Sequence, residues 1–198
     1  MAGGLPFILD AEARSAGPLC GRRGKEMSAE GSRTNVTEPP ADASANRYAA
    51  ARVVRRIIHA TPEKLFAAWT EPVRLAQWWG PEGVSCPRAE IDLRVGGPYR
   101  IANRFPDGTL VWIVGVFEVL EPPHRLVYTW RLESQFKEPE RVTVCFEPRG
   151  ASTEVIVVHE RIDDATTRAD HERGWKGCLD GLANYVYSTF GGHIAPSA

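Results

Sequence analysis

The stretch WKGCLDGLANYV, residues 175–186, decides the fold. Its apolar side chains recur at intervals of three and four residues, which is the spacing of an amphipathic α-helix. The apolar stripe consists of Trp175, Cys178, Leu179, Leu182 and Val186. The helical period extends from Thr166 to about Phe190, where a Gly-Gly pair ends it. A helix of this length, over roughly 30 Å, needs a broad apolar surface to pack against.

Strand-forming segments precede this helix, and each is bounded by turn residues. Residues 52–59 are rich in β-branched side chains and end before a Thr-Pro pair that favours a helix start. Two short helices are expected next, one from Pro62 and one through Leu75 to Trp79. The strands expected after them are residues 84–95, 99–105, 110–120, 125–132, 141–146 and 153–160. Sequential hairpins imply an antiparallel sheet. The sequence therefore predicts an α+β domain in which the C-terminal helix covers the apolar face of that sheet.

Residues 1–47 differ from the rest of the chain. They are rich in Ala, Gly, Ser, Pro and Glu, and they have no sustained apolar periodicity. Such a segment buries too little apolar surface to offset the entropy of ordering it. We therefore expect a disordered N-terminal extension, with Met27 as an alternative start, a domain at 48–190 and a C-terminal tail at 191–198.

Composition excludes several classes of function. The formal net charge is −1, which gives no electrostatic basis for binding nucleic acid. No stretch approaches the ~20 apolar residues of a membrane span. The cysteines are Cys20, Cys86, Cys145 and Cys178, and no pair has the spacing of a zinc or redox site. We expect free thiols, a cytoplasmic protein, and neither a metal nor another cofactor.

Five motifs occur in order along the chain. They are WTEP at 69–72, QWWGP at 77–81, DLRVGG at 92–97, LVYTW at 126–130 and HERGW at 171–175. Through them, residues 50–190 resemble the bacterial members of the START-like (SRPBCC) superfamily related to the C-terminal domain of the activator of the heat-shock protein 90 ATPase. The resemblance implies a helix-grip fold, in which a curved sheet wraps around the C-terminal helix. The superfamily includes lipid carriers, hormone and metabolite binders, cyclases and co-chaperone domains, so it implies a shared cavity rather than a shared reaction.

Aromatic side chains are the most informative candidates for a binding site. The six tryptophans all fall between Trp69 and Trp175. Large apolar rings with a polar edge suit a pocket for a hydrophobic or amphipathic ligand. The predicted ligand-binding residues are Trp78, Trp79, Tyr99, Trp112, Tyr128, Trp130, His159 and Trp175. The alternative is that the same rings are core residues that fill the space they surround, and Trp69 is assigned to the core.

His159 is the one weak catalytic candidate. It alternates with Val155 and Val157 on a strand, so it is expected to point towards the helix. A buried imidazole there serves as a polar anchor, as a general base, or simply as a hydrogen-bonded interior histidine. Asp92 and Arg94 share a strand face and either bind a polar group or form an exposed charged surface.

Glycines at 174, 177 and 181 interrupt the helical segment. Each costs roughly 1 kcal/mol relative to Ala inside a helix. They either widen a cavity or let a ligand approach the backbone, or they allow close packing of the helix against the sheet or form a dimer contact.

Three functions compete. The leading hypothesis is non-covalent binding of a small hydrophobic or amphipathic molecule between sheet and helix. The second is a cyclase or hydrolase that uses a His or Tyr as its acid or base. The third is a stress-related co-chaperone module with a chaperone partner, which is weakened because the N-terminal segment is short. Homodimerisation through the sheet or the helix is left open.

Overall fold

The computed structural model describes residues 51–191. The elements are β1 (Arg52–Ile58), α2 (Pro62–Thr70), α3 (Pro72–Leu75), β2 (Ala89–Ile91), β3 (Pro98–Arg104), β4 (Leu110–Glu121), β5 (Arg125–Leu132), β6 (Glu140–Arg149), β7 (Ser152–Glu160) and α4 (Ala165–Phe190). The predicted N-terminal extension, with Met27, and residues 192–198 of the predicted tail lie outside the described residues.

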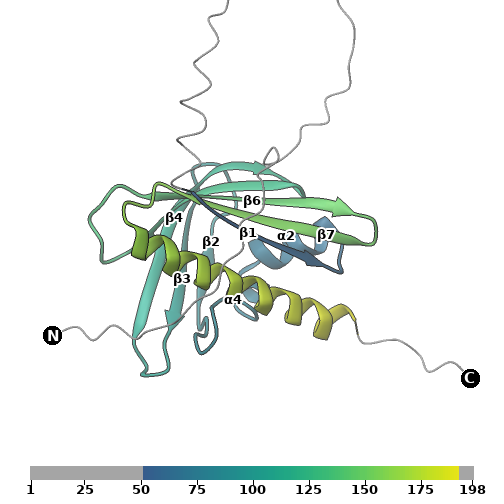
Figure 1. Cartoon of the computed structure of the whole chain (residues 1–198), viewed down its shortest axis with the longest axis horizontal. Coiled ribbons are helices and arrows are strands. Elements are labelled where there is room, and N and C mark those ends of the chain that lie inside the picture. Colours follow the sequence, from purple (N-terminus) through teal and green to yellow (C-terminus); the bar gives the residue numbers. More distant parts are fainter. Residues whose placement is uncertain (1–50, 192–198) are drawn as a thin grey trace, which may run out of the picture. The chain divides into compact units, whose positions relative to one another are not determined.

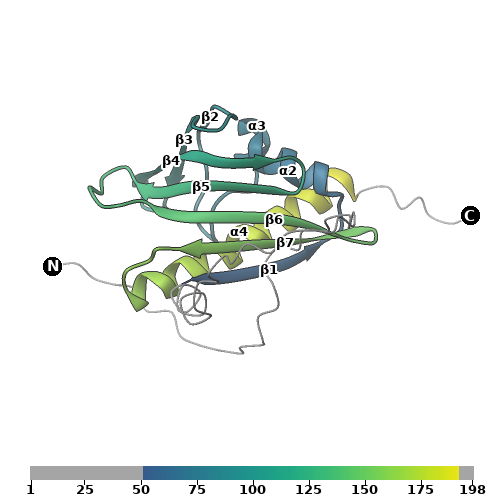
Figure 2. The same ribbon diagram turned by 90° about the horizontal axis from the view of Figure 1, so that it is seen from above.

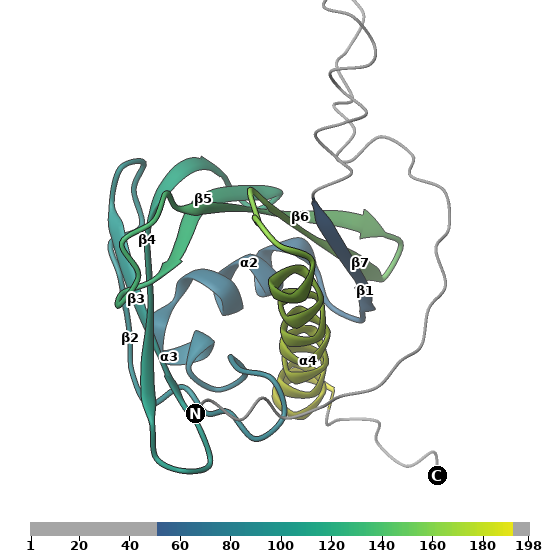
Figure 3. The same cartoon turned by 60° about the vertical axis from the view of Figure 1, so that its left-hand side comes forward.

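One curved sheet forms the frame of the domain. Its seven strands are ordered β1-β7-β6-β5-β4-β3-β2, and every neighbouring pair is antiparallel. The helix α4 runs along the inner side of the curve (Figure 1), and the strands lie side by side above it when seen from the perpendicular direction (Figure 2). Figure 3 shows α2 and α3 inside the same curve, between α4 and the β2–β4 part of the sheet. This arrangement confirms the predicted helix-grip fold.

The helix α4 is held by the stripe that the sequence predicts. Its buried residues are Trp175, Cys178, Leu179, Leu182 and Val186. The helix begins where Asp164 accepts a hydrogen bond from the backbone N–H of Thr167 at 2.8 Å, which satisfies one of the free donors of the first turn. No helix in residues 51–191 is long and apolar enough to span a membrane.

Two of the three helix glycines allow another segment to approach α4 closely. A Cβ atom on Gly181 would lie 2.6 Å from the carbonyl oxygen of Trp78, and one on Gly177 would lie 2.9 Å from the Cα of Pro81. A Cβ atom on Gly174 would have no neighbour within 4 Å. The absence of a side chain at Gly177 and Gly181 therefore allows residues 78–82 to pack closely against α4.

Two predicted elements are wrong in their bounds. The second short helix is α3, which begins and ends earlier than the predicted 75–79, since Pro72 suits a first helical position. The predicted strand at 84–95 is reduced to β2. Beyond it the chain makes a tight turn through Gly96, whose φ of 78° suits glycine. Leu93 and Val95 are 44% and 62% exposed there, so their alternation does not mark a sheet face.

The predicted charged pair belongs to the same turn. Arg94 Nε lies 2.8 Å from Asp92 Oδ2, and both side chains are largely exposed. Of the two alternatives for this pair, the exposed charged surface is the one that the structure shows.

Candidate functional site

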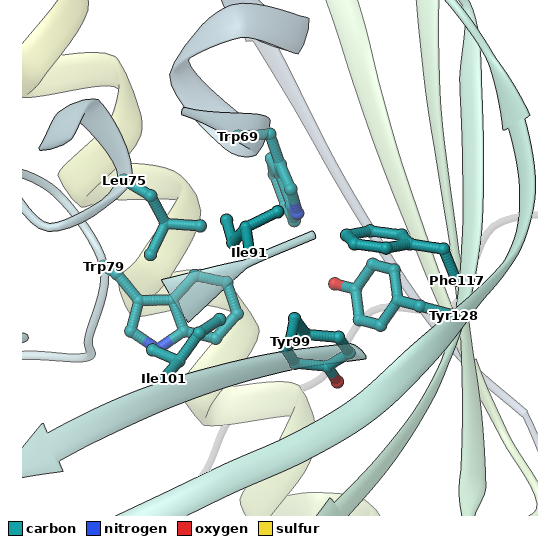
Figure 4. Close-up of a pocket in the computed structure, with 8 residues that line it drawn as sticks. All are labelled: Trp69, Leu75, Trp79, Ile91, Tyr99, Ile101, Phe117 and Tyr128. Carbon is teal, nitrogen blue, oxygen red and sulfur yellow. The ribbon is translucent and has the colours of Figure 1, made fainter. Parts of the chain in front are cut away.

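A small apolar cavity lies between the α2–α3 helices and the inner face of strands β2 to β5 (Figure 4). Its lining consists of Trp69, Leu75, Trp79, Ile91, Tyr99, Ile101, Phe117 and Tyr128. The free space is about 10 Å³, which is roughly what the centre of one water molecule needs. The lining side chains therefore fill most of the space that they surround. The cavity faces the short helices, and no side chain of α4 lines it.

Two tyrosines in the lining have different hydroxyl environments. The Tyr99 hydroxyl donates to the carbonyl oxygen of Thr129 at 2.7 Å, so it is bound to the sheet. The Tyr128 hydroxyl is buried and has no hydrogen-bond partner among residues 51–191. Figure 4 shows its oxygen directed into the space between Trp69, Ile91 and Tyr99. Burial is the main cause that raises the pKa of Tyr128, so the hydroxyl stays neutral.

A cluster of indole rings connects this cavity to α4. Trp69 lies at its centre, with ring centroids 4.9 Å from Trp78 and 6.1 Å from Trp175, and it is stacked on Trp175. Trp78 donates to the carbonyl oxygen of Ala68 at 2.9 Å, and Trp79 donates to Asn103 Oδ1 at 3.0 Å. These two N–H groups hold their rings in place and are not available to a ligand.

On its other side, Trp175 contacts a polar cluster. Its indole N–H donates to His159 Nδ1 at 3.0 Å. The Nε2 atoms of His159 and His171 each lie 2.9 Å from the same oxygen, Glu140 Oε2. The other carboxylate oxygen of Glu140 lies 2.6 Å from Lys137 Nζ. Glu140 and His159 are fully buried, whereas the His171 side chain is 15% exposed. The cluster therefore joins the sheet to the first half of α4.

The charges in this cluster follow from its contacts. Burial acts to raise the pKa of Glu140, but His159, His171 and Lys137 outweigh it and hold the pKa well below the usual range, so Glu140 is a carboxylate. Burial is also the main reason that the pKa of His159 is lowered, so this imidazole is neutral at pH 7. Because an indole N–H can only donate, His159 Nδ1 must accept and its proton must lie on Nε2.

The structure separates the predicted ligand-binding residues into four groups. Trp79, Tyr99 and Tyr128 line the cavity. Three others belong to the polar cluster: His159, Trp175, and Trp130, whose ring centroid is 4.7 Å from that of His171. Trp78 packs behind the cavity. Trp112 lies on the opposite face of the sheet, where the Arg100 guanidinium is 4.2 Å from its ring centroid.

Several residues of these two sites were not among the sequence-based candidates. In the cavity they are Trp69, Leu75, Ile91, Ile101 and Phe117, and in the polar cluster they are Lys137, Glu140 and His171. His171 lies four residues before Trp175 on the same helix face, a spacing that the sequence does show. Glu140 carries no comparable signal, because it stands in a charged segment that looks exposed.

A curved antiparallel sheet that closes around a C-terminal helix and an apolar cavity defines a helix-grip domain. Residues 59–187 match the family described as Activator of Hsp90 ATPase homolog 1-like protein, and the chain belongs to this family. No curated protein matches the chain.

Solved structures of bacterial proteins are similar over most of the domain. Protein CV1439 from Chromobacterium violaceum is 28% identical, covers 70% of this chain and 97% of its own length, and gives a TM-score of 0.63. The AHSA1 protein SPO3351 from Silicibacter pomeroyi is also 28% identical, with 70% and 99% covered and a TM-score of 0.63. A protein from Rhodobacter sphaeroides, 24% identical with 71% and 94% covered and a TM-score of 0.64, shows the shared fold alone.

Proposed function

We propose that this domain binds a small, mainly apolar molecule that carries one hydrogen-bonding group, and that it does so without covalent chemistry. The Tyr128 hydroxyl carries the proposal. It is buried, unpartnered among the described residues and directed into an apolar cavity. An unpaired buried hydroxyl costs about 1–3 kcal/mol. A ligand atom that bonds to it would recover that free energy, while the apolar lining would bind the rest of the ligand.

The ligand must open the cavity, because the free space of about 10 Å³ holds no more than a water molecule. The weakest part of the wall is where Leu75 of α3 meets Ile91 of β2. The helix α3 has four residues, and β2 is a three-residue strand at the edge of the sheet. Short elements with few partners open at lower free energy than central strands do. We therefore place the route into the cavity between α3 and β2.

Binding fits the lining better than acid–base catalysis does. Within residues 51–191, the ionisable groups that line the cavity are Tyr99 and Tyr128, and burial raises the pKa of both. A hydroxyl that stays protonated at neutral pH is a poor general base. His159 does not line the cavity, because Trp175 stands between them.

Two experiments test the proposal. Native mass spectrometry of freshly purified protein should show a retained small molecule. In parallel, NMR titration should show binding of acetophenone, an aromatic ketone that can accept from Tyr128, more tightly than its apolar analogue isopropylbenzene. One hydrogen bond of about 1 kcal/mol corresponds to a preference of roughly fivefold.

The Tyr128→Phe variant should lose that preference and still bind both probes. Trp112→Phe, on the opposite sheet face, is the matched control and should keep it. If no molecule is retained and neither probe shifts resonances of the cavity residues at concentrations of about 1 mM, the proposal is wrong.

A further inference from the structure

Three buried polar atoms converge in the polar cluster, and none of them makes a well-aligned hydrogen bond. They are Glu140 Oε2, His159 Nε2 and His171 Nε2. Both nitrogens lie 2.9 Å from the oxygen, yet neither contact has the alignment of a hydrogen bond. All three atoms lie within 4.8 Å of one another. Buried polar groups in native proteins are almost always paired, so three unpaired atoms at one point require an explanation.

We propose that Glu140, His159 and His171 form a binding site for a divalent transition-metal ion of the zinc type. Zinc binds imidazole nitrogen and carboxylate oxygen at about 2.0–2.2 Å. Two such atoms at a right angle around one ion are about 3 Å apart, and in a tetrahedral arrangement they are slightly further apart. The separation of 2.9 Å between each nitrogen and the oxygen is close to these values, and the two nitrogens lie within 4.8 Å of each other.

The kinds of ligand atom indicate which class of ion the site would bind. Two imidazoles and one carboxylate suit zinc, iron, cobalt and nickel, whereas calcium and magnesium prefer oxygen ligands throughout. Three protein ligands leave at least one coordination position for water or for another small ligand. The route for the ion passes His171, which is the partly exposed member of the three.

Surrounding groups hold the three ligands in place. Lys137 binds the second oxygen of Glu140 at 2.6 Å and leaves Oε2 to face the imidazoles. Trp130 packs edge-on against both imidazole rings, with centroid distances of 5.3 Å to His159 and 4.7 Å to His171. Partners of this kind orient ligands and adjust the affinity of a metal site.

The hydrogen bond from Trp175 gives the site an unusual property. A metal-bound histidine normally donates its other ring N–H to an acceptor. His159 Nδ1 instead accepts from the indole, so its single proton lies on Nε2, where the ion would bind. For Nε2 to bind an ion, His159 must either lose this proton to solvent and become an imidazolate, or move it to Nδ1, which requires the indole N–H to turn away. Trp175 therefore weakens metal binding, and removal of its N–H should strengthen it.

The test uses the full chain after treatment with a chelator that is then removed. Co²⁺ is titrated while visible absorption is followed, and Zn²⁺ is titrated in a calorimeter. We expect one equivalent of each ion to bind. Glu140→Gln and His171→Gln should each weaken binding by at least about tenfold, with circular dichroism confirming that the variants fold. Trp175→Phe should tighten binding by about tenfold, because Nδ1 can then carry the proton.

Two exposed histidines supply the controls. His124→Gln, in the turn between β4 and β5, and His59→Gln, after β1, should leave binding unchanged. The proposal is overturned if neither ion binds at up to about 1 mM, if either control removes binding, or if folded Glu140→Gln and His171→Gln both bind like the wild type. Weaker binding by Trp175→Phe would overturn the assigned role of the indole. The cavity experiments above are run with chelator present, so the two proposals can fail separately.

Discussion

The apolar cavity and the polar cluster lie on opposite sides of Trp175, and they differ in what their side chains need when they are buried. In the cavity, the lining side chains fill the space, and one hydroxyl is left unpaired. In the cluster, a buried carboxylate and two imidazoles meet with their reactive atoms unpaired. Apolar side chains can close a space by packing into it, whereas buried charges and dipoles need partners. The fold can therefore close its apolar site by packing alone, whereas its polar site depends on how well the three buried groups satisfy one another.

One residue supports both regions, so the largest expected effect comes from its removal. Trp175→Ala should leave a void beside Trp69 and deprive His159 of its indole donor. Large-to-small substitutions of a buried tryptophan cost about 3–5 kcal/mol. Urea denaturation should show a loss of that size. Trp112→Ala, on the other sheet face, should cost about 1 kcal/mol. Equal losses in the two variants would mean that Trp175 does not join the two regions.

The next prediction addresses the polar cluster alone. Glu140→Ala, measured in chelator, should reduce the free energy of unfolding by about 3 kcal/mol, because Lys137 loses the fully buried carboxylate that its ammonium group binds. The control is Glu133→Ala, which removes a largely exposed ion pair with Arg100 and should cost at most about 1 kcal/mol. Urea denaturation of both variants makes the comparison. A loss for Glu140→Ala as small as that for the control would show that water enters the cluster freely.

Sequence predicts the apolar region better than the polar one. The stripe of α4 follows from a period of 3.6 residues, because every residue on that face packs against the sheet and the short helices. The strands of the hairpins are predicted by the turn residues that stand at their ends. The failure at 84–95 has a clear cause: Leu93 and Val95 alternate with charges in a tight turn, and a short run with a period of two does not distinguish a turn from a strand.

The sites depend on contacts that no local pattern contains. Aromatic residue types identified Trp79, Tyr99 and Tyr128, but Ile91 and Phe117 look like ordinary core residues in sequence. Glu140 is the extreme case. Its burial results from the meeting of β6, β7 and α4, which are far apart along the chain, so a charged side chain in a charged segment gives no sign of it.

A smaller effect should distinguish the two tyrosines of the cavity. Tyr99→Phe removes a hydroxyl that bonds to Thr129 and leaves that carbonyl without its donor, so it should cost about 1 kcal/mol. Tyr128→Phe removes a hydroxyl with no partner among the described residues, so it should be neutral or slightly stabilising. Thermal or urea denaturation of both variants measures the difference. A cost for Tyr128→Phe equal to that for Tyr99→Phe would mean that the Tyr128 hydroxyl is already hydrogen-bonded in the protein without ligand.

An effect of similar size, seen only as the pH rises, tests whether the apolar side of α4 is dry. Cys178 lies three residues after Trp175, and burial raises the pKa of its thiol to about 12. In the unfolded chain the thiol loses its proton near its ordinary pKa of about 8.5. Between these two values the unfolded chain binds fewer protons, so stability must fall as the pH rises. From pH 8 to 9.5 the wild type should lose about 1 kcal/mol more than Cys178→Ala, in which this group is absent. Urea denaturation of both proteins at several pH values measures the difference, and other titrating groups cancel because both proteins share them. If the free energy of unfolding changed with pH in the same way for both proteins, water would reach the thiol. The apolar region would then not be dry, and the contrast with the polar cluster would be wrong.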